Sequence, residues 1–222
     1  MARQILAAIL LAAGLATFVS LGIWQLHRLE WKEAILAEID AKIAEPAVAL
    51  PAAPEPQADE YRAVRLAGAF EPGEILVLVS SRDYGAGFRV IAPFVTADGR
   101  RILVDRGFLP TERREATRSL GAAEIEGNLH WPDERTGSTP EDDLVGNWWY
   151  ARDVAKMAAH LGTEPVLVIA RNATDPEIRP MPVDSSSVRN KHLEYAMTWF
   201  LFAATWVLMT GYALWRIRRR YG

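Results

Sequence analysis

The sequence contains no cysteine among its 222 residues. Disulfide staples, thiol redox chemistry and thiolate metal delivery are therefore excluded. It also lacks a glycine-rich phosphate loop and a Gly-x-Ser-x-Gly nucleophile motif. The histidines do not occur at the spacing of a metal site; they are His27, His130, His160 and His192. Because no motif marks a nucleophile, an acid–base pair or a metal cluster, the sequence favours a protein that is not an enzyme.

Two long stretches lack any charged residue, residues 5–26 and residues 195–215. Each has about the 20 residues that a helix needs to cross the hydrocarbon core of a bilayer. A bilayer offers no water to unpaired backbone groups, so each run is expected to be helical throughout. The first run could alternatively be a cleaved signal peptide, although it exceeds the usual apolar length of about 7–15 residues. The second run has no comparable alternative, and aromatic residues stand at both of its ends, as in an interfacial belt.

Basic residues are concentrated after the second run, at Arg216, Arg218, Arg219 and Arg220. The positive-inside preference therefore places the C-terminus in the cytoplasm, and two crossings place the N-terminus there too. Residues 25–194 then form one translocated domain. This segment has 20 Lys and Arg against 28 Asp and Glu, a net charge of −8, which makes it a poor partner for nucleic acid. No Arg- and Ser-rich transit sequence precedes the first run, so we expect a bacterial inner (plasma) membrane with a periplasmic main domain.

The segment between the two runs predicts a helical extension, a linker and a strand-rich domain. Apolar residues recur with helical periodicity over residues 26–43, and four prolines within residues 45–56 predict an extended linker. Residues 151–162 predict a helix that stops at Gly162. Alternating patterns and turns predict strands at residues 61–70, 74–81, 88–96, 100–109, 122–130 and 164–171.

The predicted fold class is therefore a membrane protein with two transmembrane helices. They flank a strand-rich α+β extramembrane domain that has a mainly antiparallel sheet and one helix. The predicted segments are a cytoplasmic N-terminus (1–4), transmembrane helix 1 (5–26), an amphipathic helical extension with a Pro-rich linker (27–60), a periplasmic α+β domain (61–189), a membrane-entry motif with transmembrane helix 2 (190–215) and a basic cytoplasmic tail (216–222).

Two local patterns within the domain have simple structural interpretations. Gly85 and Gly87 are expected to make a turn that connects two strands. Asp105 and Arg106 precede Gly107 at a predicted strand end, where a local ion pair or a surface role is expected.

The residues of greatest chemical interest lie at the two predicted membrane entrances. Gln25 and Arg28 follow the first run, and His192, Tyr195 and Trp199 share one face of the second helix. An imidazole, flat aromatic side chains and cations suit a haem, which needs an axial ligand, apolar contacts and cationic partners for its propionates. Aromatic and basic residues also anchor helices at an interface without any ligand. Residue chemistry alone leaves both interpretations open.

Four segments of the chain also match known motifs, and they stand in the same order. They are "GIWQLHRLEWK", "YRAVRLAGAF", "GAGFRVIAPFVTADGRRILVDRGFLP" and "NKHLEYAMTWF". In these segments, which span nearly its whole length, the chain resembles the Surfeit locus protein 1 family, the assembly factors of cytochrome c oxidase. The resemblance implies a two-span inner-membrane protein that helps to mature the haem-a-containing catalytic subunit of the oxidase.

The resemblance further implies haem a as a transient cargo. His192 matches the histidine that the family offers as the candidate axial ligand of the haem iron, and Trp199 falls on the tryptophan of the same signature. Gln25 and Arg28 match polar positions of the first motif. In this hypothesis Tyr195 and Trp199 flank the haem ring, and Arg28 or Arg189 meets the propionates.

The implied partners are the catalytic subunit of cytochrome c oxidase and the lipid bilayer, with haem a synthase as a further candidate. The alternative function is a membrane-anchored interaction scaffold for oxidase assembly that binds no haem itself.

Overall fold

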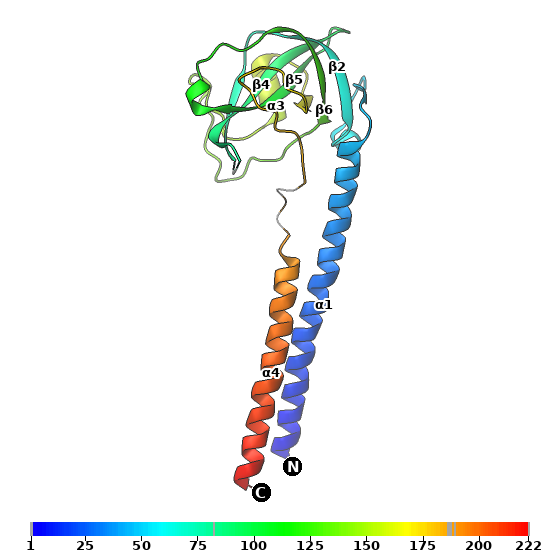
Figure 1. The fold of residues 1–222 in the computed structure, drawn as a ribbon, viewed down its shortest axis with the longest axis vertical. Helices are drawn as coiled ribbons and strands as arrows, with labels where there is room; N and C mark the ends of the chain where they lie inside the picture. The colour runs from blue at the N-terminus through cyan, green and yellow to red at the C-terminus, as the bar shows by residue number, and fades with distance from the viewer. Residues whose placement is uncertain (1, 82, 186–187, 189, 222) are drawn as a thin grey trace. The chain divides into compact units, whose positions relative to one another are not determined.

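The computed structural model describes residues 2–81, 83–185, 188 and 190–221. The chain divides into two compact units, Ile39–Asp184 and the pair of segments Met1–Glu38 and Ser185–Gly222. Figure 1 shows the order of the elements along the chain. They are α1 (Ala2–Ala44), β1 (Val48–Ala49), α2 (Pro56–Asp59), β2 (Ala63–Phe70), β3 (Ile75–Ser81), β4 (Gly85–Thr96), β5 (Arg101–Pro110), the 3-10 helix η1 (Thr111–Arg113), β6 (Gly121–Leu129), α3 (Val154–Leu161), β7 (Leu167–Ala170) and α4 (His192–Tyr221).

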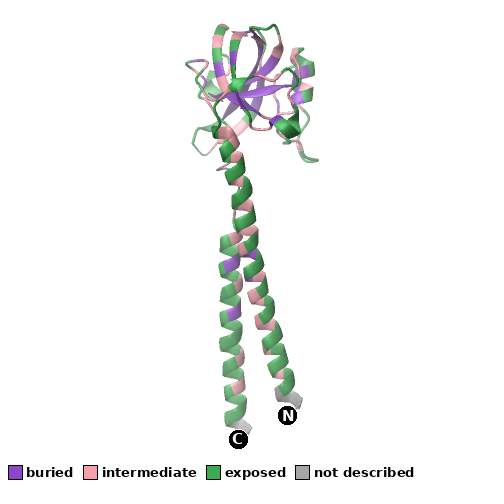
Figure 2. Cartoon of the chain, turned by 90° about the vertical axis from the view of Figure 1, so that its right-hand side faces the viewer, coloured by how far each residue is buried: buried purple, intermediate pink, exposed green. Residues whose placement is uncertain are grey.

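The helices α1 and α4 each contain a stretch long and apolar enough to cross a membrane, Ile5–Ala44 and His192–Arg219. This confirms the two predicted spanning helices. The two helices lie side by side and run antiparallel (Figure 1). Figure 2 shows that most of their surface is exposed in the isolated chain, as expected for helices whose solvent is lipid. Helix α1 continues without a break to Ala44, as its periodicity predicted.

The strands of the other unit form one seven-stranded sheet in the order β1-β2-β6-β7-β5-β4-β3. A further antiparallel pairing joins the end of β2 to the end of β4, from Gly68↔Thr96 to Phe70↔Phe94. This pairing closes β2, β6, β7, β5 and β4 into a ring, so the sheet forms a small barrel. The β1–β2 and β5–β7 pairs are parallel, and the remaining pairs of the described sheet are antiparallel. The predicted strand-rich domain with a mainly antiparallel sheet is confirmed.

Glycine allows the close approaches of the strands that this ring requires. A Cβ at Gly68 would lie 2.1 Å from the carbonyl oxygen of Val95, where β2 meets β4. Gly87 lies inside β4, where a Cβ would lie 2.4 Å from the carbonyl oxygen of Leu109. The expectation of a turn is wrong for Gly87, which close strand packing explains and sequence spacing does not reveal. Gly85, with φ +82°, is the first residue of β4 and pairs with Ser81 at the end of the connection between β3 and β4.

Three apolar clusters hold the barrel unit together. The first fills the ring and includes Phe94, Ile125 and Val168. The second packs α3 against the outside of the sheet through Met157 and Trp149, and the third lies around Phe88, Val90 and Ile178. Burial of these side chains, at about 25 cal/mol per Å² of apolar surface, is the main stabilising force of the unit.

Helix α3 matches the prediction from sequence. The Asp153 side chain accepts a hydrogen bond from the backbone N–H of Lys156, which caps the start of the helix. Gly162 ends it in the left-handed conformation, with φ +66°.

Asp105 and Arg106 are fully buried within β5, so the expected surface role is wrong. Asp105 pairs with Arg89 at 2.6 Å and with Arg152 at 3.5 Å, and Arg106 lies 3.5 Å from Asp175. Both residues form ion pairs, but with distant partners instead of the expected local one, and both charges are inside the fold. Buried charges persist only when they are paired and hydrogen-bonded, and here the partners come from distant segments that sequence spacing could not identify.

Candidate functional site

The candidate site lies where the start of α4 meets the middle of α1. Nδ1 of His192 is 2.7 Å from Oε1 of Gln25. Gln25 is 9% exposed and His192 is half-buried, so this contact is largely removed from solvent. The backbone N–H of His192 donates to Oδ1 of Asn190 at the first turn of the helix. The structure therefore brings together two residues that are 167 positions apart.

The contact favours the tautomer in which Nδ1 carries the proton. An amide oxygen can only accept a hydrogen bond, so with Oε1 of Gln25 facing the ring, Nδ1–H donates to it and Nε2 of a neutral imidazole keeps its lone pair. Histidines that bind metals usually donate their other N–H group to an oxygen acceptor in this way. The pair therefore suits a single axial ligand to a haem iron. Among the described residues, no group of three or more His, Asp or Glu side chains could hold a metal ion.

Close packing of the two helices positions this pair. A Cβ at Gly22 would lie 2.6 Å from the ring of Phe200, and a Cβ at Gly14 would lie 2.5 Å from the ring of Trp206. Nε1 of Trp206 also donates to the carbonyl oxygen of Leu11 at 3.2 Å. Small residues that admit large side chains from a neighbour are a common feature of membrane helix pairs. This antiparallel packing places His192 opposite Gln25.

The aromatic residues of the site are in different environments. The ring of Trp199 stacks on Phe18 of α1, with centroids 6.1 Å apart and an interplanar angle of 23°. It also meets Phe202 edge-on at 5.8 Å. Tyr195, by contrast, is 55% exposed. Trp199 therefore takes part in helix pairing, while Tyr195 remains accessible.

Arg28 lies over the ring of Trp31 on its own helix, with the guanidinium carbon 4.1 Å from the ring centroid. This cation–π contact holds the side chain along α1. Arg189 lies outside the described residues.

The sequence did not identify two residues of the site, Phe18 and Gly22. A single sequence carries no signal for Phe18, whereas the position of Gly22 in an apolar helix was a usable sign of close packing.

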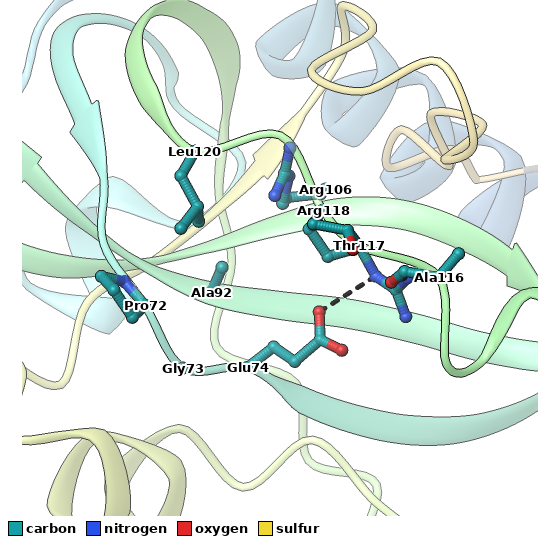
Figure 3. Close-up of a pocket in the computed structure, with 9 residues that line it drawn as sticks. All are labelled: Pro72, Gly73, Glu74, Ala92, Arg106, Ala116, Thr117, Arg118 and Leu120. Carbon is teal, nitrogen blue, oxygen red and sulfur yellow. Dashed lines mark hydrogen bonds and ion pairs between the residues drawn. The ribbon is translucent and has the colours of Figure 1, made fainter.

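A separate recess of about 270 Å³ lies in the barrel unit (Figure 3). It is lined by Pro72, Gly73, Glu74, Ala92, Arg106, Ala116, Thr117, Arg118 and Leu120. Glu74 pairs with Arg118 at 3.1 Å. Burial raises the pKa of Glu74 above its usual value, and the nearby Arg118 and Arg106 offset only part of that effect. The predicted site residues do not line this recess.

Comparisons with known proteins agree with this architecture. A family model described as the SURF1 family matches residues 12–204, which include Gln25, Arg28, His192, Tyr195 and Trp199. Surfeit locus protein 1 of Rattus norvegicus is 33% identical over 214 residues, which cover 86% of this chain and 70% of that protein. A SURF1-like protein of Monosiga brevicollis is 34% identical over 233 residues, covering 96% and 87%.

A bacterial protein is similar to the same extent. A SURF1-like protein of Rickettsia felis is 31% identical over 205 residues, covering 86% of this chain and 89% of that protein. The matched residues run from α1 through the barrel into α4. With this coverage of both helices and the domain between them, the chain belongs to the SURF1 family.

Proposed function

We propose that the chain is a non-catalytic assembly factor for cytochrome c oxidase that carries haem a as a transient cargo for the catalytic subunit. Its place is a bacterial inner membrane, with the barrel on the periplasmic side. Family membership supports the assembly role, and the arginines after the apolar part of α4 support the orientation.

The single observation that carries the haem proposal is the hydrogen bond between His192 and Gln25. It leaves Nε2 with its lone pair at the entrance to an apolar helix pair, where the exposed Tyr195 is one residue of the surrounding surface. A carrier must also release its cargo, and one neutral imidazole binds iron less firmly than two axial ligands. His192 would hold the iron, and Arg28 would meet a propionate on leaving the Trp31 ring.

Absorption spectroscopy of the purified full-length protein tests this proposal. The wild-type protein, purified from cells that make haem a, is expected to carry haem, and His192→Ala is expected to lose most of it. His27→Ala is the matched control, because His27 is an exposed histidine of α1 that lies close to Gln25 in sequence. Equal haem occupancy in wild type and His192→Ala would show that His192 is not the ligand.

The role of Gln25 is tested separately, by the amount of bound haem and the position of its Soret band. Gln25→Leu removes the acceptor for Nδ1–H but keeps a side chain of similar volume. Loss of such a supporting partner typically lowers metal affinity about 10–100-fold. The haem that remains bound is expected to show a shifted Soret band, because the orientation and basicity of the imidazole change. A merely structural role for Gln25 would lower the protein yield without moving the band.

One observation favours the alternative, a membrane-anchored scaffold that binds no haem. One face of the Trp199 ring is stacked on Phe18, although the side chain as a whole is half-buried. A scaffold needs only a stable helix pair, whereas a haem that stacked on this face of Trp199 would have to displace Phe18. The scaffold is favoured if wild-type protein co-purifies with the oxidase catalytic subunit but contains no haem in cells that make haem a.

A further inference from the structure

A loop of the barrel unit, residues 141–150, exposes two apolar side chains at its tip. Val145 is 100% exposed and Leu144 is 46% exposed. Isolated exposed apolar residues are normal on proteins, but here two adjacent ones occupy the end of a turn. We call Leu144 and Val145 the apolar tip.

The turn that carries the apolar tip is closed by hydrogen bonds. The backbone groups of Asp143 and Trp148 bond to each other twice, at 2.9 Å each. Oδ1 of Asp143 accepts from the backbone N–H of Val145 at 3.1 Å and of Gly146 at 2.9 Å. The conformation of the tip is therefore set before any partner arrives.

The base of the loop is joined to the barrel. Asn147, with φ +53°, accepts from the N–H of Leu76 and donates to the carbonyl oxygen of Glu74. Trp149 is fully buried and exchanges backbone hydrogen bonds with β3. Arg114 lies over the Trp148 ring at 4.5 Å and donates to the carbonyl oxygen of Gly146. A loop this well anchored loses little conformational entropy on binding.

Charge indicates the chemistry of the partner. Glu141 and Asp143 are exposed beside the tip, whereas the carboxylate of Asp142 points inward and pairs with Arg135 and Lys156 at 2.5 Å. Residues 140–150 contain no Lys or Arg, and the cations beside the loop, Arg114, Arg135 and Lys156, are half-buried and bound to Gly146 or Asp142. The exposed charges next to the tip are therefore carboxylates, which disfavour anionic lipid headgroups. A protein pocket that is apolar at its centre and basic at its rim is complementary to it.

From these observations, we propose that the apolar tip is a docking element that inserts into an apolar protein pocket rimmed by Lys or Arg. We place that pocket on the catalytic subunit of cytochrome c oxidase, a step that rests on the proposed function. The preformed turn supplies shape, Leu144 and Val145 supply apolar contact, and the two carboxylates supply orientation.

Co-purification of the full-length protein with the oxidase catalytic subunit tests this proposal. Val145→Asp is expected to reduce recovery of the subunit about tenfold, as is typical of a central interface residue. Leu120→Asp is the matched control, because Leu120 is 54% exposed elsewhere on the same unit, and it is expected to retain the subunit. Since the Val145 side chain is fully exposed, Val145→Asp should melt at the wild-type temperature.

A photoreactive amino acid at position 145 provides a second readout that does not depend on a loss of binding. Cross-linking to the catalytic subunit supports the proposal. Cross-linking only to lipid or only to a second copy of this chain overturns it. If wild type and Val145→Asp recover the subunit equally, the docking element is wrong while the proposed function stands. If wild type recovers none, the proposed partner and the docking element both fail.

Discussion

Gly22 of α1 lies directly against the ring of Phe200 of α4, and a Cβ at position 22 would be 2.6 Å from that ring. The site depends on this approach, because His192 begins the helix that carries Phe200 and reaches Gln25 three residues after Gly22. The relationship between Gly22 and Phe200 therefore connects helix packing to the proposed haem ligand.

Gly22→Leu is expected to separate the helices and to lower the thermal midpoint of the full chain in detergent, because overpacking costs about 1–3 kcal/mol. Gly211→Leu is the matched control, since a Cβ at Gly211 of α4 would meet no atom within 4 Å. Thermal unfolding followed by tryptophan fluorescence measures both. Equal melting of Gly22→Leu and wild type would contradict the observed packing.

Arg171 binds the end of α1. It donates to the carbonyl oxygen of Ile43 and, at 2.7 Å, to Oδ1 of the buried Asn128. A cation at a helix C-terminus satisfies a carbonyl group that the helix leaves without a partner. Arg171→Met is expected to loosen the last turn of α1. Amide hydrogen exchange there should speed up about 10–100-fold, because a hydrogen bond to a charged group contributes about 1.5–3 kcal/mol.

Arg65→Met provides the control for this prediction, because Arg65 is an exposed arginine of the barrel with Glu126 at 3.6 Å. It should leave exchange at residues 40–45 unchanged. Unchanged exchange in Arg171→Met as well would mean that α1 does not need this contact.

Asp175 makes the free energy of unfolding depend on pH in the acidic range. Burial would raise its pKa, but hydrogen bonds from the N–H groups of Ser119 and Glu177 and the charge of Arg106 hold the pKa below its usual value. A lowered carboxyl pKa stabilises the fold at neutral pH, and this contribution is lost as the pH falls through the folded-state pKa, below about 3.9. Asp175→Asn leaves Arg106 buried with a weaker partner and should cost about 3–5 kcal/mol at pH 7.

The measurement for Asp175 is the midpoint of urea unfolding at several pH values. The difference between wild type and Asp175→Asn should shrink as the pH falls toward 3. Glu112→Gln removes an exposed carboxylate and should show no such difference. A constant difference across this pH range would exclude the charge of Asp175 as the cause.

Glu74 in the barrel recess should have the opposite pH dependence. Its pKa is raised, chiefly by burial, so the folded state favours the protonated form. The associated stability is present below about pH 4.3 and is lost as the pH rises through the folded-state pKa. Glu74→Gln keeps a neutral side chain, and its thermal midpoint should rise relative to wild type between pH 4 and pH 7. A fall over that range would show that the Arg118 pair outweighs burial.

Sequence patterns predicted most of the local structure. Period-two alternation located six strands, and the apolar face of Val154, Met157 and Ala158 located α3 together with its Gly162 end. The linker was predicted to be extended, but its pairing with a strand of the sheet was not predicted. Val48 and Ala49 form β1 and pair in parallel with Val64 and Arg65 of β2, 16 residues further along the chain, a contact that propensity alone cannot reveal.

At the candidate site, the sequence identified the residues but not their contacts. Gln25 and His192 stood out because polar side chains bordered charge-free runs. The stack of Trp199 on Phe18 and the contact of Arg28 with Trp31 were not predictable, because rotamers and helix rotation depend on packing.

The sequence by itself determined the two membrane-length helices, the strand-rich domain between them and the chemical types at the membrane entrance. Periodicity and the absence of charge depend only on neighbouring residues, and these suffice for such features. Only the tertiary structure decided the closure of the barrel, the burial of Asp105 and Arg106 and the hydrogen bond between His192 and Gln25. Each of these joins residues that are far apart in the chain, and their contact follows from the packing of the whole fold.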